Sequence, residues 1–295
     1  MQTTTGITSG NQLLKWVGNK QRMASEIIRF FPDNYATYFE PFLGSGAVLG
    51  TLAPRKAIAS DILAPLMGIW ELVRDDPETL IAAYAHYRDR IEQGEDKRSV
   101  YAEALQAYNT HPNSKDFIFL SRACYGGVIR FRRKDGAMST PCGAHMPIST
   151  ASFRGRVMAW HAAVSDVDFR TSDFRPIFAE VTAGDLVYCD PPYVDSQKIL
   201  YGAQSFCLAD LIEQINEAKN RGAYVALSID GSKRSGLHTI LHDFPEGLFE
   251  TEVDITVGRS MLKRFQRNGE SLADEVVKDR LLLTYVPALQ STLNF

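Results

Sequence analysis

The chain has 295 residues, of which 45% are hydrophobic and 23% charged, a balance typical of a globular protein and not of a disordered one. A formal net charge of −3 excludes a uniformly basic surface, although partners respond to local patches of charge. The four cysteines show no metal-ligand spacing, so we expect reduced thiols, no disulfide framework and no metal site. The polar N-terminus and the lack of any run of 18 apolar residues predict a cytoplasmic protein.

The first part of the chain alternates between helices and strands. Residues 18–32 carry apolar side chains at helical spacing, and residues 36–53 follow the pattern of a strand, a glycine turn and a helix. Residues 56–61 form a second short strand that ends in an acid. Between residues 64 and 108 the pattern becomes helical, with acids and a proline that are typical of a helix start. This helical region interrupts the alternation.

A basic segment follows at residues 121–156, which contains seven arginines and lysines and only one acid. Strand patterns then resume at residues 166–174, 185–193, 222–230, 248–257 and 279–287, with a helix at residues 209–221 between two of them. Strand, helix and strand in this order predict a mostly parallel sheet with right-handed crossovers.

The simplest fold class is therefore a doubly wound, Rossmann-like α/β domain built from both ends of the chain. We expect this domain to comprise residues 1–63 and 160–295, with a helical and basic insert at residues 64–159.

Three strand ends carry groups that suit an adenosine-shaped ligand. Gly44 and Gly46 form a turn between a strand and a helix, where a backbone without Cβ can approach a ligand closely. Asp61 ends the next strand and can accept bonds from two ribose hydroxyls. Asp173 follows a third strand and can accept a hydrogen bond from an adenine amino group, and Phe174 beside it can cover the ring. We expect these groups to line one edge of the sheet.

The stretch "DPPY" at residues 190–193 follows a short apolar strand. Two prolines lock the backbone and end the strand, so Asp190 lies on a stiff loop at its carboxyl end. With S-adenosylmethionine as the ligand, an enzyme has mainly to orient a nucleophile toward an already activated methyl group. Asp190 and the carbonyl of Pro191 can accept both N–H bonds of a base's exocyclic amine, Pro192 stiffens the loop, and Tyr193 can stack on the base.

These motifs resemble those of the alpha-group, Dam-like DNA adenine-N6 methyltransferases. The similar segments are "LKWVGNK" at 14–20, "FEPFLGSGAV" at 39–48, Asp61, "SDF" at 172–174 and "DPPY" at 190–193, in that order and with an insert before the fourth. The resemblance implies a methyltransferase sheet with an inserted target-recognition domain, double-stranded DNA as the substrate, and S-adenosylmethionine as the cofactor. It implies a flipped adenine held by Asp190, Pro191 and Tyr193. The cofactor residues implied are Trp16, Lys20, Phe42, Gly44, Ser45, Gly46, Asp61, Asp173, Phe174 and Asp190.

The recognition segment of that family is similar to residues 122–143 here. The matched positions predict DNA contacts from Lys15, Arg122, Tyr125, Arg130, Arg132, Arg133 and Lys134. Lys15 and Arg130 would read bases, Tyr125 would wedge into the stack, and Arg132, Arg133 and Lys134 would meet phosphates. Gly126 and residues 138–140 depart from the family's pattern, so the target sequence stays open. A second basic stretch, residues 258–269 with Arg264, is either a DNA clamp or a solvated loop.

Several alternatives remain at this stage. The same amine geometry serves cytosine N4 or an RNA base, although Asp190 in place of serine favours adenine. A DNA-binding protein that keeps the fold without activity is a different class, which Lys20 and Asp61 argue against. A nicotinamide oxidoreductase would need a third small residue where Leu49 stands. By resemblance the protein would be bacterial, archaeal or phage-encoded, with a cognate restriction endonuclease as a partner acting on the same site.

Overall fold

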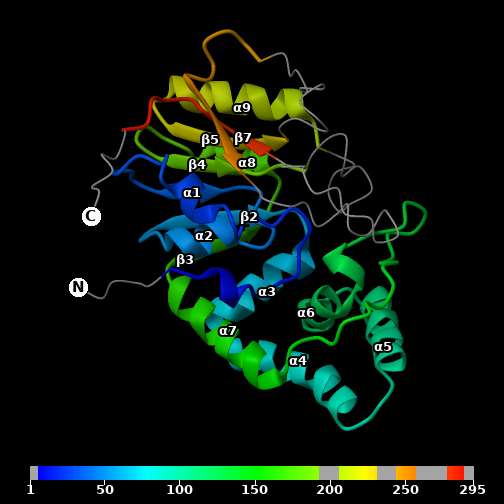
Figure 1. The fold of residues 1–295 in the computed structure, drawn as a ribbon. Coiled ribbons are helices and arrows are strands. Elements are labelled where there is room, and N and C mark those ends of the chain that lie inside the picture. Colours follow the sequence, from blue (N-terminus) through cyan, green and yellow to red (C-terminus); the bar gives the residue numbers. More distant parts are fainter. Residues whose placement is uncertain (1–5, 193–205, 231–243, 257–277, 289–295) are drawn as a thin grey trace.

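The computed structural model describes residues 6–192, 206–230, 244–256 and 278–288. Figure 1 shows a twisted sheet with helices on both faces and a block of helices beside one of its ends. Tyr193 and Arg264, two of the predicted site residues, lie outside the described residues, and so does the basic stretch 258–269. Within the described ranges, no helix is both long enough and apolar enough to cross a membrane.

A seven-stranded sheet forms the centre of the molecule, in the order β3-β2-β1-β4-β5-β7-β6. The strands are β1 (Tyr38–Glu40), β2 (Ala57–Asp61), β3 (Val167–Thr171), β4 (Leu186–Cys189), β5 (Tyr224–Asp230), β6 (Thr251–Thr256) and β7 (Lys278–Leu283). The pairs among β1 to β5 are all parallel, whereas β7 runs antiparallel to both β5 and β6. The carboxyl ends of β1, β2, β3 and β4 therefore meet at one edge of the sheet, which is where doubly wound folds bind ligands.

Helices cover both faces of this sheet. The described helices of the whole molecule are α1 (Ala24–Ile28), α2 (Ala47–Leu52), α3 (Ala64–Asp75), α4 (Pro77–Glu92), α5 (Lys97–Thr110), α6 (Ser114–Ala123), α7 (Thr150–Ala163), α8 (Phe174–Ala179) and α9 (Leu208–Asn220), with short 3-10 turns η1 (Ser9–Asn11) and η2 (Tyr125–Gly127). All four β4 residues are buried and they alternate: Leu186 and Tyr188 join the core under α1, α2, α3 and α7, and Val187 and Cys189 join the core under α8 and α9. A strand buried on both faces reads as a continuous apolar run, as "LVYC" does.

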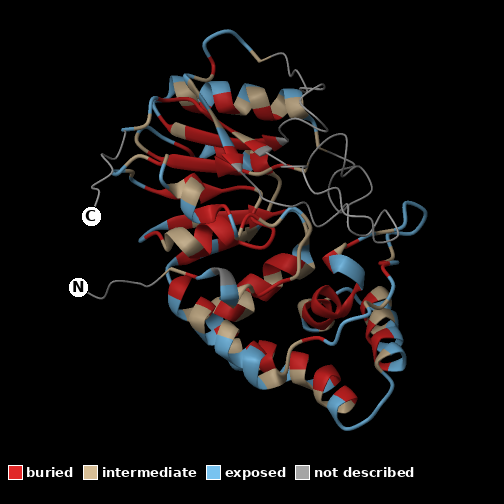
Figure 2. Ribbon diagram, viewed as in Figure 1, coloured by how far each residue is buried: buried red, intermediate tan, exposed pale blue. Residues whose placement is uncertain are grey.

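The helical block consists of α4, α5 and α6 packed around one another, with α3 and α7 between this block and the sheet (Figure 1). Helix α6 lies inside the block, and every residue from Phe117 to Ala123 is buried (Figure 2). Side chains cap the helix starts, since Asp76, Asp96 and Asn113 each accept a bond from a backbone amide in the first turn. The predicted division at residues 63 and 160 stays a prediction, and α3 contacts both β2 and α6.

The predicted α/β class and the doubly wound sheet are confirmed. One element is shorter than expected: the helix predicted over residues 18–32 spans only Ala24–Ile28. Gly18 has φ of 80°, a left-handed conformation that cannot continue a helix, and residues 21–23 form a turn. The segment before α1 is therefore irregular, with turns at residues 17–18 and 21–23, and it carries Trp16 and Lys20 to the pocket.

Candidate active site at the carboxyl edge of the sheet

A pocket opens where the carboxyl ends of the parallel strands meet. Its lining comes from the segment before α1, the turn after β1, the ends of β2 and β3, the loop after β4 and the recognition segment. The predicted residues in this lining are Trp16, Lys20, Phe42, Gly44, Ser45, Asp61, Asp173, Phe174, Asp190, Pro191 and Pro192. The sequence did not point to Glu40, Gly127, Ile129, Tyr188 or Phe206, which also line it.

Hydrogen bonds with neighbouring core residues hold the glycine turn in place. Gly44 and Gly46 have φ of 48° and 65°, which side chains rarely adopt. The Gly44 amide donates to Asp61 Oδ2 at 3.1 Å, and the indole of Trp70 donates to the Gly44 carbonyl at 3.2 Å. Gly46 is not among the lining residues, because it packs against the rings of Trp70 and Trp160. Gly46 therefore shapes the turn from behind, and Gly44 faces the pocket.

Asp61 is a buried carboxylate at the end of β2. Its two oxygens accept bonds from the amides of Gly44 and Leu63, each at 3.1 Å. Burial nevertheless raises its pKa to about 6, because these bonds do not fully replace water. Each carboxylate oxygen can accept more than one bond, so Asp61 keeps acceptor capacity toward the pocket.

Aromatic rings surround the end of the pocket near β3. Phe42 and Phe174 lie with ring centroids 5.4 Å apart, and Phe206 meets both rings at an edge. Asp173 caps α8 by accepting from the Arg175 amide at 3.0 Å, and its Oδ1 also accepts from the Arg175 guanidinium. The Arg175 guanidinium lies 4.6 Å from the Phe174 ring centroid and also pairs with Asp210. This end of the pocket therefore offers flat apolar walls with a carboxylate at the rim.

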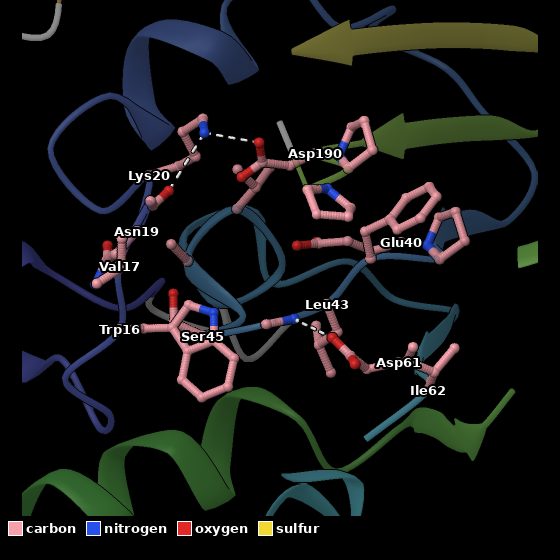
Figure 3. A pocket seen from close by; sticks show the side chains of 18 of the residues that line it. Trp16, Val17, Asn19, Lys20, Glu40, Leu43, Ser45, Asp61, Ile62 and Asp190 are labelled. Carbon is pink, nitrogen blue, oxygen red and sulfur yellow. Dashed lines mark hydrogen bonds and ion pairs between the residues drawn. The ribbon is translucent and has the colours of Figure 1, made fainter. Parts of the chain in front are cut away.

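Asp190 follows β4, and a buried cation fixes its carboxylate. Lys20 Nζ donates to Asp190 Oδ1 at 2.7 Å and to the Gly18 carbonyl at 3.3 Å (Figure 3). Lys20 is only 3% exposed, so the ion pair lies largely out of water. Figure 3 shows this pair on one side of the pocket and Asp61 with Ile62 on the other. The two predicted carboxylates thus face one cavity from two strands.

Glu40 is the main site residue that sequence reasoning missed. It ends β1, is 2% exposed, and accepts a bond from the Tyr38 hydroxyl at 2.6 Å. Burial raises its pKa to about 8, and the negative charge of Asp190 adds to the shift. The signal was present in the sequence, because Glu40 ends an apolar strand directly before the glycine turn, as Asp61 ends the next one.

The predicted DNA-contacting residues fall into two groups. Tyr125, Arg130, Arg132, Arg133 and Lys134 are exposed on η2 and on a hairpin closed by the bridge between Phe131 and Met138. Lys15 is half-buried, and burial together with nearby Arg122 lowers its pKa. Gly127 lies so close to Lys15 that a Cβ there would meet its backbone at 3.0 Å. The recognition segment therefore touches the segment that runs into the pocket.

Arg122 differs in its surroundings from the other predicted DNA-contacting residues. It is 3% exposed, and its guanidinium donates to the carbonyls of Gln12 and Leu13. Burial lowers its pKa to about 10. Arg122 therefore anchors the chain just before Lys15 from inside the protein and presents no charge at the surface.

The comparisons with known proteins agree with this geometry. Residues 16–230 match the model of the D12 class N6 adenine-specific DNA methyltransferases. A type II methyltransferase of Methanocaldococcus jannaschii, M.MjaIII, is 31% identical, over 61% of this chain and 68% of its own length. Another type II methyltransferase, M1.LlaDCHI of Lactococcus lactis, is 24% identical over 74% of this chain and 80% of its own. A DNA adenine methylase of Haemophilus influenzae is 29% identical over 70% and 75%.

The doubly wound sheet has a pocket at the carboxyl ends of its parallel strands, where α/β folds of this class bind their ligands. The chain belongs to the D12 class of N6 adenine-specific DNA methyltransferases. The predicted resemblance and the predicted adenine specificity are thereby confirmed, and the oxidoreductase, cytosine-N4 and RNA alternatives lose their support. Among the described residues no group of histidines, cysteines and acids could hold a metal ion.

Proposed function

We propose that the protein binds S-adenosylmethionine in this pocket and methylates N6 of an adenine flipped out of duplex DNA. The observation that carries the proposal is the arrangement of Asp61 and Asp190, two strand-end carboxylates that line one pocket, the second held by buried Lys20. A ligand with hydroxyl donors at one end and a reacting centre at the other fits between them.

The chemistry of the donor set fits this cofactor. Asp61 accepts bonds from backbone amides and offers further acceptor sites to ribose hydroxyls. Phe42 and Phe174 form flat apolar walls for a purine, and Asp173 at their rim accepts from its amino group. When bound, the cofactor supplies a methyl group activated by the sulfonium charge.

Asp190 and the loop after it prepare the nucleophile. The carboxylate of Asp190 and the carbonyl of Pro191 each accept one N–H bond of the adenine amine, which draws the nitrogen lone pair out of the ring. Lys20 holds the Asp190 carboxylate in one orientation, and the prolines fix the direction of the carbonyl. Pro192 lines the pocket, and Tyr193 serves as the stacking surface for the base.

The exposed recognition segment supplies the DNA contacts. Lys15 and Arg130 read base edges, Tyr125 fills the gap left by the flipped base, and Arg132, Arg133 and Lys134 meet phosphates, with Arg264 as a further contact. The type II relatives M.MjaIII and M1.LlaDCHI support a role in restriction and modification. We propose a cognate endonuclease for the same site on this basis, and a cytoplasmic location.

The test is to express the protein in cells that lack other methyltransferases and to map N6-methyladenine in their DNA. We expect one motif to be methylated at nearly every occurrence. Asp190→Asn should abolish the signal while equilibrium dialysis still detects S-adenosylmethionine binding. Asp166→Asn, which changes an exposed acid before β3, is the matched control and should methylate as the wild type does. Methylation by Asp190→Asn at the wild-type level would overturn the role of Asp190, and wild-type protein that binds no S-adenosylmethionine would overturn the cofactor.

A further inference from the structure

Asp279 contacts the site through Lys20, although it comes from a distant part of the sequence. It is near the start of β7, beyond the residues that match the family model. Because β7 runs antiparallel to β5, its start lies at the carboxyl edge of the parallel strands, where Asp279 is in register with Asp230. This antiparallel placement brings Asp279 to the same edge as Asp190.

The Asp279 carboxylate reaches the buried cation of the site. Its Oδ2 lies 3.7 Å from Lys20 Nζ, whereas Asp190 Oδ1 lies 2.7 Å from the same nitrogen. The side chain of Asp279 is 12% exposed and that of Lys20 is 4% exposed, so solvent screens this contact weakly. Lys20 is thus an ammonium between two carboxylates, one in direct hydrogen bond and one in ion contact.

An ionised carboxylate at this position would be costly without the cation. Asp279, Leu281 and Leu283 lie on the same face of β7, since successive side chains of a strand point to opposite faces. The two leucines belong to the same core as Tyr188 and the buried residues of α1. Burying a charge beside such a core destabilises a protein unless the charge is paired. A leucine or valine would suit the strand better, so the acid at this position points to a task other than folding.

We propose that Asp279 is a positioning residue for methyl transfer, which acts through Lys20 on Asp190. Lysine has a flexible stem and three rotatable donors, so a single carboxylate leaves its ammonium several arrangements. A second carboxylate from β7 confines the ammonium between two strand ends, and the confined ammonium keeps Asp190 Oδ1 in place. The inference rests on the proposed role of Asp190 in holding the adenine amine.

The charges around Lys20 also favour this role over simple neutralisation. Asp190 alone balances one lysine charge, and Glu40 next to it is mainly protonated at neutral pH because burial raises its pKa to about 8. The second carboxylate is therefore not required for neutrality. Its contribution is geometric, and it should affect the rate of the chemical step more than ligand affinity.

The experiment compares Asp279→Asn, Asp279→Ser and Asp279→Glu in the full-length protein. Methyl transfer is measured in a single turnover with saturating S-adenosylmethionine and saturating DNA from cells without methyltransferases. We expect Asn and Ser to slow the step by about tenfold, a size typical of coupled polar neighbours, and Glu to recover most of the rate. The dissociation constant for S-adenosylmethionine and the KM for DNA should change less than about twofold, because Asp279 is not among the residues that line the pocket.

Arg280→Gln is the matched control. Arg280 follows Asp279 on β7 and pairs with Glu252 on β6, so its loss removes an ion pair from the same strand. A purely structural role for Asp279 predicts equal effects of Arg280→Gln and Asp279→Asn on the rate. Positioning predicts a wild-type rate for Arg280→Gln. Equal slowing in the two variants would overturn the proposal.

Lys20→Met completes a double-mutant cycle. If Asp279 acts through Lys20, the loss from Asp279→Asn disappears once Lys20 is replaced, whereas independent roles would multiply. Multiplied losses, or a wild-type rate in Asp279→Asn, would overturn the inference. Failure of the proposed role of Asp190 is distinguishable, because in that case Asp190→Asn itself would keep its activity whatever the Asp279 variants do.

Discussion

The pocket and the hairpin closed by the bridge between Phe131 and Met138 both carry charged residues, but the pocket buries them and the hairpin exposes them. In the pocket, Asp61, Lys20 and Glu40 are buried and already bonded to the protein. On the hairpin, Arg133 and Lys134 are exposed, and Figure 2 shows this loop as a pale blue projection. The pocket must present fixed geometry to one small ligand, whereas the hairpin must meet a long polyanion whose charge is the same everywhere. Substitutions should therefore affect stability and chemistry in the first region and DNA affinity in the second.

Two glycines with similar positive φ angles give the largest expected contrast. Gly46 behind the pocket has φ of 65°, and Gly136 on the hairpin has φ of 68°. A Cβ on Gly46 would lie 3.1 Å from the Trp70 ring and 3.4 Å from that of Trp160, while a Cβ on Gly136 would meet nothing within 4 Å. We expect Gly46→Ala to lower the free energy of unfolding by about 3 kcal/mol and Gly136→Ala by about 1 kcal/mol.

Urea unfolding measures both variants, and backbone strain is common to the two. The difference between them therefore reports the crowding by the two indoles alone. Similar losses of stability in both variants would mean that the indoles of Trp70 and Trp160 move to accommodate the new methyl group. The glycine turn would then be less rigid than its contacts indicate.

The pH dependence of stability should come from the pocket. Burial raises the pKa of Glu40 from its ordinary 4.5 to about 8, so the folded protein keeps a proton that the unfolded chain releases. The stability from that proton is fully present below pH 4.5 and is lost as the pH rises through 8. Between pH 7 and pH 9 the wild type should lose about 1.4 kcal/mol more than Glu40→Gln does.

Chemical denaturation at the two pH values tests this, with Asp135→Asn on the hairpin as the control. Asp135 is fully exposed and has a pKa below its ordinary value, so it is ionised across this range in both states. Its replacement should leave the pH dependence unchanged. If Glu40→Gln loses as much stability as the wild type, then another group carries the titration.

The two regions also differ in how much of them the sequence predicts. Asp61, Asp173 and Asp190 were predictable because each lies at or just after the end of a short strand, which is a local pattern, and parallel strands bring such ends to one edge. Asp279 follows no strand, because it lies near the start of one that runs the other way, and a strand's direction depends on distant pairing. Phe206 and Gly127 reach the pocket only through tertiary packing, so they carried no local signal.

Arg122 also shows that the sequence alone does not reveal which residues tertiary packing buries. Its place in a basic segment predicted an exposed contact, but it belongs to the end of α6, whose last seven residues are buried within the helical block. Charge composition says that a segment is basic, and only the packing of helices says which of its arginines face water. The fold class was easier to predict, since it follows from the order of strands and helices along the chain.

The smallest expected effect is on the hairpin, and it depends on salt. Arg133→Gln together with Lys134→Gln removes two charges that we expect to meet phosphates, and should weaken DNA binding about fivefold at physiological salt. The matched control is Arg55→Gln with Lys56→Gln, an exposed basic pair just before β2 at the opposite edge of the sheet. Both double variants change the net charge equally, so a difference between them reports position.

The decisive quantity is the slope of the logarithm of DNA affinity against the logarithm of salt concentration. The hairpin variant should lower this slope by about 2, one for each lost phosphate contact, with unchanged unfolding and unchanged S-adenosylmethionine binding. The control pair should leave the slope at its wild-type value. Equal slopes in the two variants would mean that DNA responds only to the overall charge of the protein, and that the hairpin does not face the phosphates. A lowered slope in the hairpin variant alone would place the DNA on the side of the protein where the pocket opens, as a flipped adenine requires.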